Sequence, residues 1–223
     1  MHLEALSRYR FSAAKRRDLS LVWKVLVDDY FSRWVKATDA VLDYGAGSCH
    51  FINNVRAWRR VACNLKPAVR QHCAHGVEFV VGANPAALSG QKFDIIFISN
   101  LPEHPENAQE VIDLLGGLRD LLTENGSLLI LQPNLALVGR RHFDFIDHKT
   151  VLTDRSLDEA LVLAGGGIAS KTIRFLRYAS KSPLAKAPRL VRADLRVPLA
   201  DCFLGRQTSV VTRPRAAAAA AQS

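Results

Sequence analysis

The chain has 223 residues, of which 48% are hydrophobic and 23% charged, a composition that excludes a wholly disordered protein. No apolar run approaches the roughly 18 residues needed to cross a bilayer, and charges interrupt the N-terminal apolar residues too often for a secretion signal, so we expect a cytoplasmic protein. The net charge of +9 is uneven, because residues 1–170 are balanced whereas residues 171–223 hold eleven basic groups and two acids. Such a region favours an anionic partner or only solvates the surface.

Three parts are predicted along the chain. Residues 1–38 carry apolar residues at helical spacing between charged positions and are expected to form an N-terminal helical lid segment. Residues 39–214 are expected to form the main domain, with a basic insert at 178–205 between the last two strands. Residues 215–223 are an alanine-rich, low-complexity tail.

The main domain alternates strand and helix signals. Strands are predicted at Ala40–Leu42, Arg60–Cys63, Val77–Val81, Phe93–Ile98 and Ser127–Leu131. The segments between them suit helices, most clearly Glu106–Leu122. This alternation predicts an α/β fold with a mostly parallel sheet covered by helices on both faces.

The pattern changes after Pro133. An irregular aromatic and charged stretch is followed by a helix that begins near Thr153 and ends at Gly165. Strands are expected at Ile168–Phe175 and Thr208–Thr212. Within the insert, Arg189–Arg196 is predicted to form a basic amphipathic helix.

A glycine turn follows the first predicted strand. Gly45 and Gly47 allow the backbone to turn tightly and a ligand to approach the main chain. A dinucleotide-binding loop would need a third glycine at position 50, where this chain has His50, so NAD and FAD are disfavoured. Asp43 would repel a phosphate but attract the ammonium and sulfonium groups of S-adenosyl-L-methionine.

The second strand ends at Asn64, 19 residues after Gly45, where an acidic residue often holds a ribose diol. An amide oxygen can accept the same hydrogen bond at a loss on the order of 1 kcal/mol. We therefore expect cofactor binding to survive this residue.

Several sequence motifs in this order resemble the class I S-adenosylmethionine-dependent methyltransferases, over roughly residues 20 to 213. These motifs are Asp43-x-Gly-x-Gly, strand-end Asn64, Phe93–Asn100 followed by Glu103-His104, and Leu122–Ile130. The resemblance implies a Rossmann-like class I methyltransferase domain with a seven-stranded, mostly parallel sheet and an antiparallel last strand. More narrowly, Gly47–Asn54, Phe143–Leu157 and Lys181–Leu184 are similar to a bacterial branch of the type 11/12 small-molecule methyltransferases. Members of that branch often occur alongside glycosyltransferases, which points to sugar or lipid substrates.

The resemblance also implies a set of cofactor-binding residues, with S-adenosyl-L-methionine as methyl donor and S-adenosyl-L-homocysteine as product. These residues are Asp43, Gly45, Ala46, Gly47, Asn64, Leu65, Asn84, Ser99 and Asn100. The chain departs from the family pattern at three positions. Cys49 stands where a third glycine is common, and Asn64 and Asn84 stand where acids are common.

Methyl transfer is an in-line displacement, so orientation alone can supply much of the rate, and a base is optional. For a hydroxyl acceptor we expect His104 to act as base or substrate contact; the alternative is that it only organises the loop with Glu103. Asp147 and His148 are predicted to form an orienting pair, and a structural role for His148 is the alternative.

No metal is expected. The groups at His104, His142, Asp144, Asp147 and His148 match no ligand spacing. The cluster His72-Cys73-Ala74-His75, with only Cys63 nearby, is also not a zinc motif. The four cysteines, Cys49, Cys63, Cys73 and Cys202, include no close pair and are expected to be reduced thiols.

The basic insert leaves the acceptor open. Lys181, Arg189 or Arg192 would grip an anionic acceptor, or Leu190, Val191, Leu195 and Val197 would lie on an anionic membrane near a lipid-linked or sugar-linked substrate. An RNA methyltransferase is a second hypothesis, but no RNA-binding module is present and few aromatic residues lie among the basic ones, so nucleic acid is disfavoured. A non-catalytic binding protein with a methyltransferase fold is the third. The oligomeric state is left undetermined.

Overall fold

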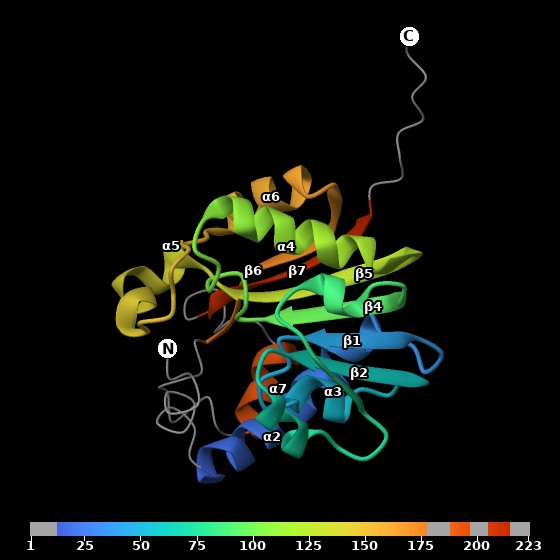
Figure 1. Cartoon of the computed structure of the whole chain (residues 1–223). Helices are drawn as coiled ribbons and strands as arrows, with labels where there is room; N and C mark the ends of the chain where they lie inside the picture. The colour runs from blue at the N-terminus through green and yellow to red at the C-terminus, as the bar shows by residue number, and fades with distance from the viewer. Residues whose placement is uncertain (1–12, 178–187, 197–204, 215–223) are drawn as a thin grey trace.

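The computed structural model describes residues 13–177, 188–196 and 205–214, which form a seven-stranded sheet between two layers of helices (Figure 1). The strands are β1 (Ala40–Tyr44), β2 (Arg59–Asn64), β3 (Glu78–Val81), β4 (Phe93–Ser99), β5 (Leu122–Pro133), β6 (Gly166–Arg177) and β7 (Gly205–Pro214). Their order is β3-β2-β1-β4-β5-β7-β6. Neighbours from β3 to β5 pair in parallel, and β7 is antiparallel to both β5 and β6. This confirms the predicted fold class.

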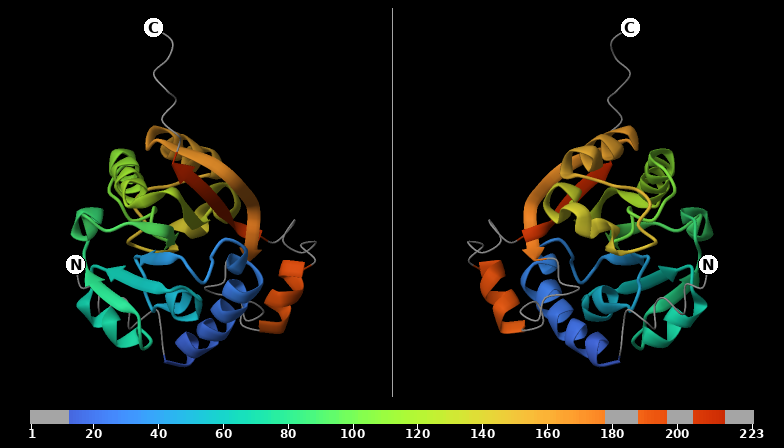
Figure 2. Two further views of the ribbon diagram at one scale, coloured as in Figure 1. Left: turned by 90° about the vertical axis from the view of Figure 1, so that its right-hand side faces the viewer. Right: turned by 90° about the vertical axis from the view of Figure 1, so that its left-hand side faces the viewer.

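The helices divide between the two faces of the sheet. One face carries α2 (Ala13–Asp29), α3 (His50–Asn54) and α7 (Pro188–Arg196), and the other carries α4 (Ala108–Asp120) and α6 (Asp154–Leu163), as Figures 1 and 2 show. The short helix α5 (Leu135–Val138) follows β5 and leads into a 3-10 turn at Gly139–Asp144. Crossover helices on both faces bury the sheet, which explains why its strands are continuous apolar runs.

Capping residues fix where the two long crossover helices begin. Asn107 precedes α4, and its side-chain oxygen accepts a hydrogen bond from the backbone N–H of Glu110 at 3.0 Å. Thr153 and Ser156 form a reciprocal capping box at the start of α6. Gly165, with φ near +78°, ends the following turn in the left-handed conformation that glycine tolerates.

Two connections are shorter than the sequence predicted. The segments after β2 and β3 suit helices by pattern, but they form 3-10 turns at Pro67–His72 and Pro85–Leu88. Each turn opens on a proline, and Asn84 caps the second one. Pro at the first position pre-sets the helical φ, but the two turns span only six and four residues, and a helix that short is not stable alone.

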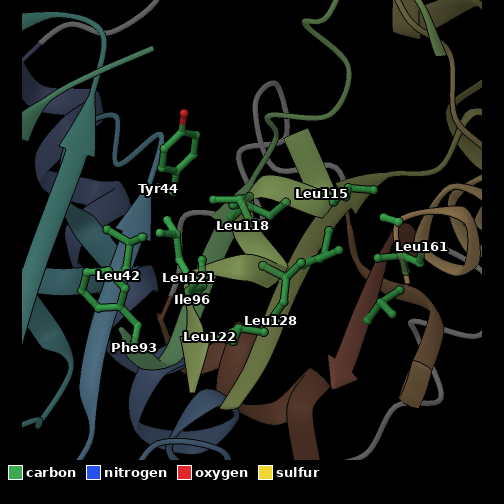
Figure 3. Close-up of a cluster of buried hydrophobic side chains, with 14 of the residues drawn as sticks. Leu42, Tyr44, Phe93, Ile96, Leu115, Leu118, Leu121, Leu122, Leu128 and Leu161 are labelled. Atoms are coloured by element: carbon green, nitrogen blue, oxygen red, sulfur yellow. The ribbon is translucent and has the colours of Figure 1, made fainter. Parts of the chain in front are cut away.

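The core consists of two layers of side chains, one on each face of the sheet. Figure 3 shows one layer, in which Leu42 and Ile96 from the sheet meet Leu115 and Leu118 of α4. The opposite layer contains an aromatic cluster in which Phe97 of β4 stacks on Phe51 of α3, with ring centroids 3.9 Å apart.

The N-terminal helix α2 is part of this second layer. Its Val22, Val25 and Leu26 are buried, and Trp23 meets Phe97 edge-on at 5.8 Å. Residues 13–29 thus cover one face of the sheet, and a lid function for residues 1–38 stays a prediction.

The described part of the basic insert is α7, which packs beside α2 (Figure 2). Val191 is buried and Leu195 half-buried against the core, and Arg192 Nε lies 2.6 Å from Asp29 Oδ2. Two of the four apolar side chains considered for a membrane therefore face the protein, whereas Leu190 is exposed. Lys181 and Val197 lie outside the described residues. Among the described helices, none has the length and apolar character to span a bilayer.

Candidate active site

The turn after β1 is held against β2 by backbone hydrogen bonds. The N–H groups of Gly45 and Ala46 both donate to the carbonyl of Cys63, at 2.9 and 3.1 Å. Gly45 has φ of +79°, and a Cβ there would lie 3.1 Å from Leu101 Cδ1 in the loop after β4. Backbone conformation and close approach together require glycine at this position. Gly47 is also in the left-handed region, with φ of +52°.

Cys49 takes the conformation that a third glycine would supply. Its φ is +57°, it immediately precedes α3, and its side chain is buried. The thiol lies 3.2 Å from Cys73 Sγ, and burial raises its pKa. The departure from the family pattern at this position therefore leaves the glycine turn intact. Among the described cysteines, Cys49, Cys63 and Cys73 are all free thiols, as predicted.

Asp43 lies buried beneath the turn, with 4% of its surface exposed. Burial raises the pKa of its carboxyl to about 7, and a hydrogen bond from the backbone N–H of Ile52 opposes that rise. Asp43 lies on the sheet face that α2 and α3 cover. It therefore places a carboxyl between the end of β1 and the first turn of α3.

The predicted contacts on β2 and β3 are amides that cap local turns. Asn64 Oδ1 accepts the backbone N–H of Lys66, and Asn84 Oδ1 accepts that of Ala86, both at 2.9 Å. Leu65, which follows β2, is 53% exposed. An oxygen has a second lone pair, so these bonds leave each amide able to accept another donor.

The end of β4 supplies the remaining predicted cofactor residues. Ser99 is the last residue of the strand, and its Oγ is buried with no hydrogen-bond partner among the described residues. Asn100 has φ of +50°, a conformation that Asn tolerates better than most residues. All nine predicted cofactor residues thus lie in the last two positions of one of four adjacent parallel strands or in the loop that follows it. The carboxyl edge of such a sheet is where open α/β folds bind ligands.

The loops after β4 and β5 bring the predicted catalytic residues together. His104 Nδ1 lies 2.9 Å from the backbone carbonyl of Asp147 and 3.9 Å from its Oδ2. His148 instead faces Glu103, with 4.0 Å between Nε2 and Oε1. Asp147 thus contacts His104, and the predicted pairing of Asp147 with His148 stays a prediction.

Glu103 is the residue that sequence reasoning underestimated. It is fully buried, and its carboxylate oxygens have no hydrogen-bond partner among the described residues beyond its own backbone N–H. Burial raises the pKa of Glu103 to about 8, and the Asp147 carboxylate adds to the rise. A glutamate between two loop residues looks exposed in sequence, so no local signal predicts this burial.

His142 also belongs to this cluster. It is buried, its ring centroid lies 4.7 Å from that of His148, and Phe145 also stacks on His148, at 4.8 Å. Burial lowers the pKa of His142, opposed by a backbone group of Thr150. Phe143 is 64% exposed and so is not core.

The two loops are joined by a set of backbone and side-chain bonds. The N–H groups of Lys149 and Thr150 donate to the carbonyl of Glu103 at 2.8 and 3.1 Å. Thr150 Oγ1 donates to the carbonyl of Pro105 at 2.7 Å, and Lys149 pairs with Glu106. The catalytic candidates are therefore held in a fixed relative position.

A separate hollow of about 430 Å³ lies at the other edge of the sheet, where Lys92, Leu122 and Thr123 begin β4 and β5. Parallel sheets bind ligands at their carboxyl edge, so this hollow is not the candidate site.

No protein-family model and no curated protein matches this chain. Solved structures do. One is a complex between the Haloferax volcanii Trm112 methyltransferase activator and a methyltransferase, 17% identical, covering 91% of this chain and 96% of that chain with a TM-score of 0.63. A second is an S-adenosylmethionine-dependent methyltransferase from Archaeoglobus fulgidus, 14% identical, with 95% and 99% covered and a TM-score of 0.63. A third, from Clostridium acetobutylicum, is 11% identical, with 86% and 92% covered and a TM-score of 0.62. The chain therefore has the fold of the class I S-adenosylmethionine-dependent methyltransferases.

Proposed function

We propose that this protein transfers a methyl group from S-adenosyl-L-methionine to a small or lipid-linked or sugar-linked, anionic acceptor. The observation that carries the proposal is the turn at Gly45–Gly47, where a Cβ at Gly45 would fill the space against Leu101. The buried carboxyl of Asp43 lies beneath that turn, and the buried Ser99 Oγ, which has no hydrogen-bond partner in the described part of the chain, ends the adjacent strand β4; both are polar groups suited to a cationic, amino-acid-bearing ligand.

The same groups argue against a phosphate-bearing cofactor. A phosphate needs positive charge or a row of free N–H groups at a helix start. The N–H groups of Gly45 and Ala46 are already bonded to Cys63, and Asp43 adds an acid beneath them. A donor with positive charge is the better electrostatic match.

S-adenosyl-L-methionine, when bound, supplies an electrophilic methyl group on a sulfonium, and S-adenosyl-L-homocysteine leaves after the transfer. The acceptor's nucleophilic atom attacks that carbon as the carbon–sulfur bond breaks. The role proposed for the chain is to align the two and to take a proton from the acceptor. His104 suits the second task, because its Nδ1 bonds a carbonyl and must therefore carry the proton, leaving Nε2 basic.

The acceptor is proposed to bind beside the loops after β4 and β5, because these loops lie at the same edge of the sheet as the glycine turn. His104 and His148, with Asp147 as the orienting residue, follow β4 and β5 at the edge that holds the glycine turn. The side chain of His104 is 36% exposed, so it can reach an acceptor. The exposed basic residues of α7, Arg189 and Arg192, are candidates to attract an anionic one.

Titration calorimetry with S-adenosyl-L-methionine, S-adenosyl-L-homocysteine and NAD tests the donor. We expect both adenosyl ligands to bind and NAD not to bind. The Gly45→Ala variant should bind the donor at least tenfold more weakly, because Cβ adds a left-handed strain of about 1–2 kcal/mol and presses on Leu101.

Gly90→Ala is the matched control. Gly90 has φ of +80°, the same backbone strain, but nothing lies within 4 Å of an added Cβ, and it precedes β4 at the opposite edge of the sheet. Its donor affinity should equal that of the unmodified protein. Equal affinities for all three proteins would place the donor elsewhere, and no binding of either adenosyl ligand would favour a non-catalytic protein with this fold.

A further inference from the structure

We propose that Glu103, His104 and His148 form a binding site for a divalent transition-metal ion of the zinc class. One donor atom from each of the three residues lies within 4.8 Å of the others. The sequence predicted no metal because the spacing matched no ligand motif. The fold brings the residues together from two loops that are more than forty positions apart.

The distances suit a metal site after small side-chain rotations. Donors around a tetrahedral zinc ion lie about 2.0–2.2 Å from it and hence about 3.4 Å from one another. Glu103 Oε1 and His148 Nε2 are already 4.0 Å apart. That pair needs to close by about 0.6 Å and the others by at most about 1.4 Å, a range that rotations about the χ angles of Glu and His can cover.

The buried carboxylate is the independent observation that points to a cation. Glu103 is fully buried, and no donor beyond its own backbone N–H satisfies its oxygens within the described chain. A buried carboxyl in this condition is costly unless it is protonated, paired or bound to a metal. Two imidazoles have a nitrogen within 4.8 Å of it, and imidazoles share the metal with a carboxylate in many protein sites.

His104 is already fixed in the form that binds a metal. Its Nδ1 lies 2.9 Å from the carbonyl oxygen of Asp147, and a carbonyl only accepts hydrogen bonds. Nδ1 therefore carries the proton, and Nε2 carries the lone pair. Metal-binding histidines typically donate their other N–H to a carbonyl or carboxylate in this way, and the bond fixes both tautomer and ring orientation.

Two neighbouring features complete the surroundings. The His148 ring stacks on Phe145 and meets the tilted ring of His142, so these two contacts constrain its orientation. The bonds from Lys149 and Thr150 to the carbonyl of Glu103 hold both loops before any ion arrives. A site that is organised in advance loses less entropy on binding.

Two nitrogen donors and one oxygen donor favour an ion of the zinc class over Mg²⁺ or Ca²⁺, which prefer oxygen ligands. Three protein ligands leave a coordination position open, as catalytic metal sites do. If the proposed function holds, an acceptor oxygen in that position would lose its proton more readily, and His104 would then serve as a metal ligand and not as the base, because Nε2 has a single lone pair. That role rests on the proposed function, whereas the metal site itself does not.

Calorimetry of Zn²⁺ binding to the untagged, chelator-treated full chain tests the proposal. We expect one ion per chain, and about a hundredfold weaker binding in Glu103→Gln and in His104→Ala. The first variant keeps the shape of the buried side chain, and the second changes a partly exposed one, so the pair separates ligand loss from misfolding. Circular dichroism checks the fold of each.

Two control variants address the other metal-binding groups. His75→Ala removes an exposed histidine, and Cys73→Ser removes a thiol of the Cys49–Cys73 pair; both should bind Zn²⁺ like the unmodified protein. With Co²⁺ as a probe, the visible spectrum should show nitrogen and oxygen ligands without thiolate charge-transfer bands. Binding that is lost in Cys73→Ser but kept in Glu103→Gln would overturn the proposal, as would no Zn²⁺ binding at all. Donor affinity, measured separately, shows whether the methyl-transfer proposal fails with it.

Discussion

The glycine turn after β1 and the histidine-bearing loops after β4 and β5 lie at the same edge of the sheet but are built differently. The turn is made from consecutive residues, and its partners are the neighbouring strand and the helix that follows it. The two loops are irregular and far apart in sequence, and they hold their shape through bonds to each other. A short sequence motif therefore determines the shape of the turn, whereas the tertiary fold determines the shape of the two loops.

The difference shows in the side chains beneath each region. Helix α3, directly after the glycine turn, is anchored by Phe51, which is 2% exposed and stacks on Phe97. The loop after β5 instead exposes Phe143 and Ile146 to solvent and buries the imidazole of His142. Buried apolar packing therefore holds the glycine turn, whereas polar contacts hold the histidine-bearing loops.

The largest effect is expected from a substitution of Phe51, which anchors the helix that follows the glycine turn. Phe51→Ala should lower the free energy of unfolding by about 3–5 kcal/mol, because it removes a buried ring from an aromatic cluster and leaves a cavity. Urea unfolding measures the loss.

Phe143→Ala makes the same chemical change in the loop after β5, where the ring is 64% exposed. Its effect on unfolding should stay within about 0.5 kcal/mol. Similar losses in the two variants would contradict the contrast between the regions.

The next effect concerns pH and the buried carboxyl of Asp43. Its pKa is about 7 in the folded chain and about 3.9 when unfolded, so the folded state binds the proton more tightly. Stability from this group is present below about pH 4 and is lost as pH rises to about 7, by up to about 4 kcal/mol. In Asp43→Asn this loss of stability between about pH 4 and about pH 7 should be absent. Free energies of unfolding that change in parallel with pH in the two proteins would contradict this prediction.

The same titration should act oppositely on donor binding. A cationic donor needs the ionised carboxylate, so affinity should rise by about tenfold from about pH 6 to about pH 8 in the unmodified protein. Calorimetry at several pH values should find a flat profile in Asp43→Asn.

The smallest effect concerns the hydrogen bond between Thr150 and Pro105, which joins the loops after β4 and β5. Thr150→Val keeps the side-chain shape but removes the 2.7 Å hydrogen bond to the carbonyl of Pro105, at a cost of about 1–2 kcal/mol. Amide hydrogen exchange should become faster in residues 145–152 and unchanged around the glycine turn.

Thr38→Val, at an exposed position, is the control and should leave exchange unchanged throughout. Faster exchange across the whole sheet in Thr150→Val would mean that the bond supports the core and not the loops.

Much of the fold was predictable because its signals are local. An apolar run predicts strand β4, and the capping residues Asn107 and Thr153 predict where two helices begin. The weakest predictions were the segments after β2 and β3, where a helical pattern lacked the length to form a helix.

The candidate site likewise has a part that the local sequence predicts and a part that depends on tertiary contacts. The sequence by itself determined the glycine turn, the acid at Asp43 and the strand-end amides, because a parallel sheet brings successive strand ends to one edge whatever the connections do. Only the tertiary structure decided that Asp147 meets His104, that His148 meets Glu103 and that Glu103 is buried. Those contacts join irregular loops distant in sequence, and the burial of a side chain there depends on what packs over it, which no residue spacing records.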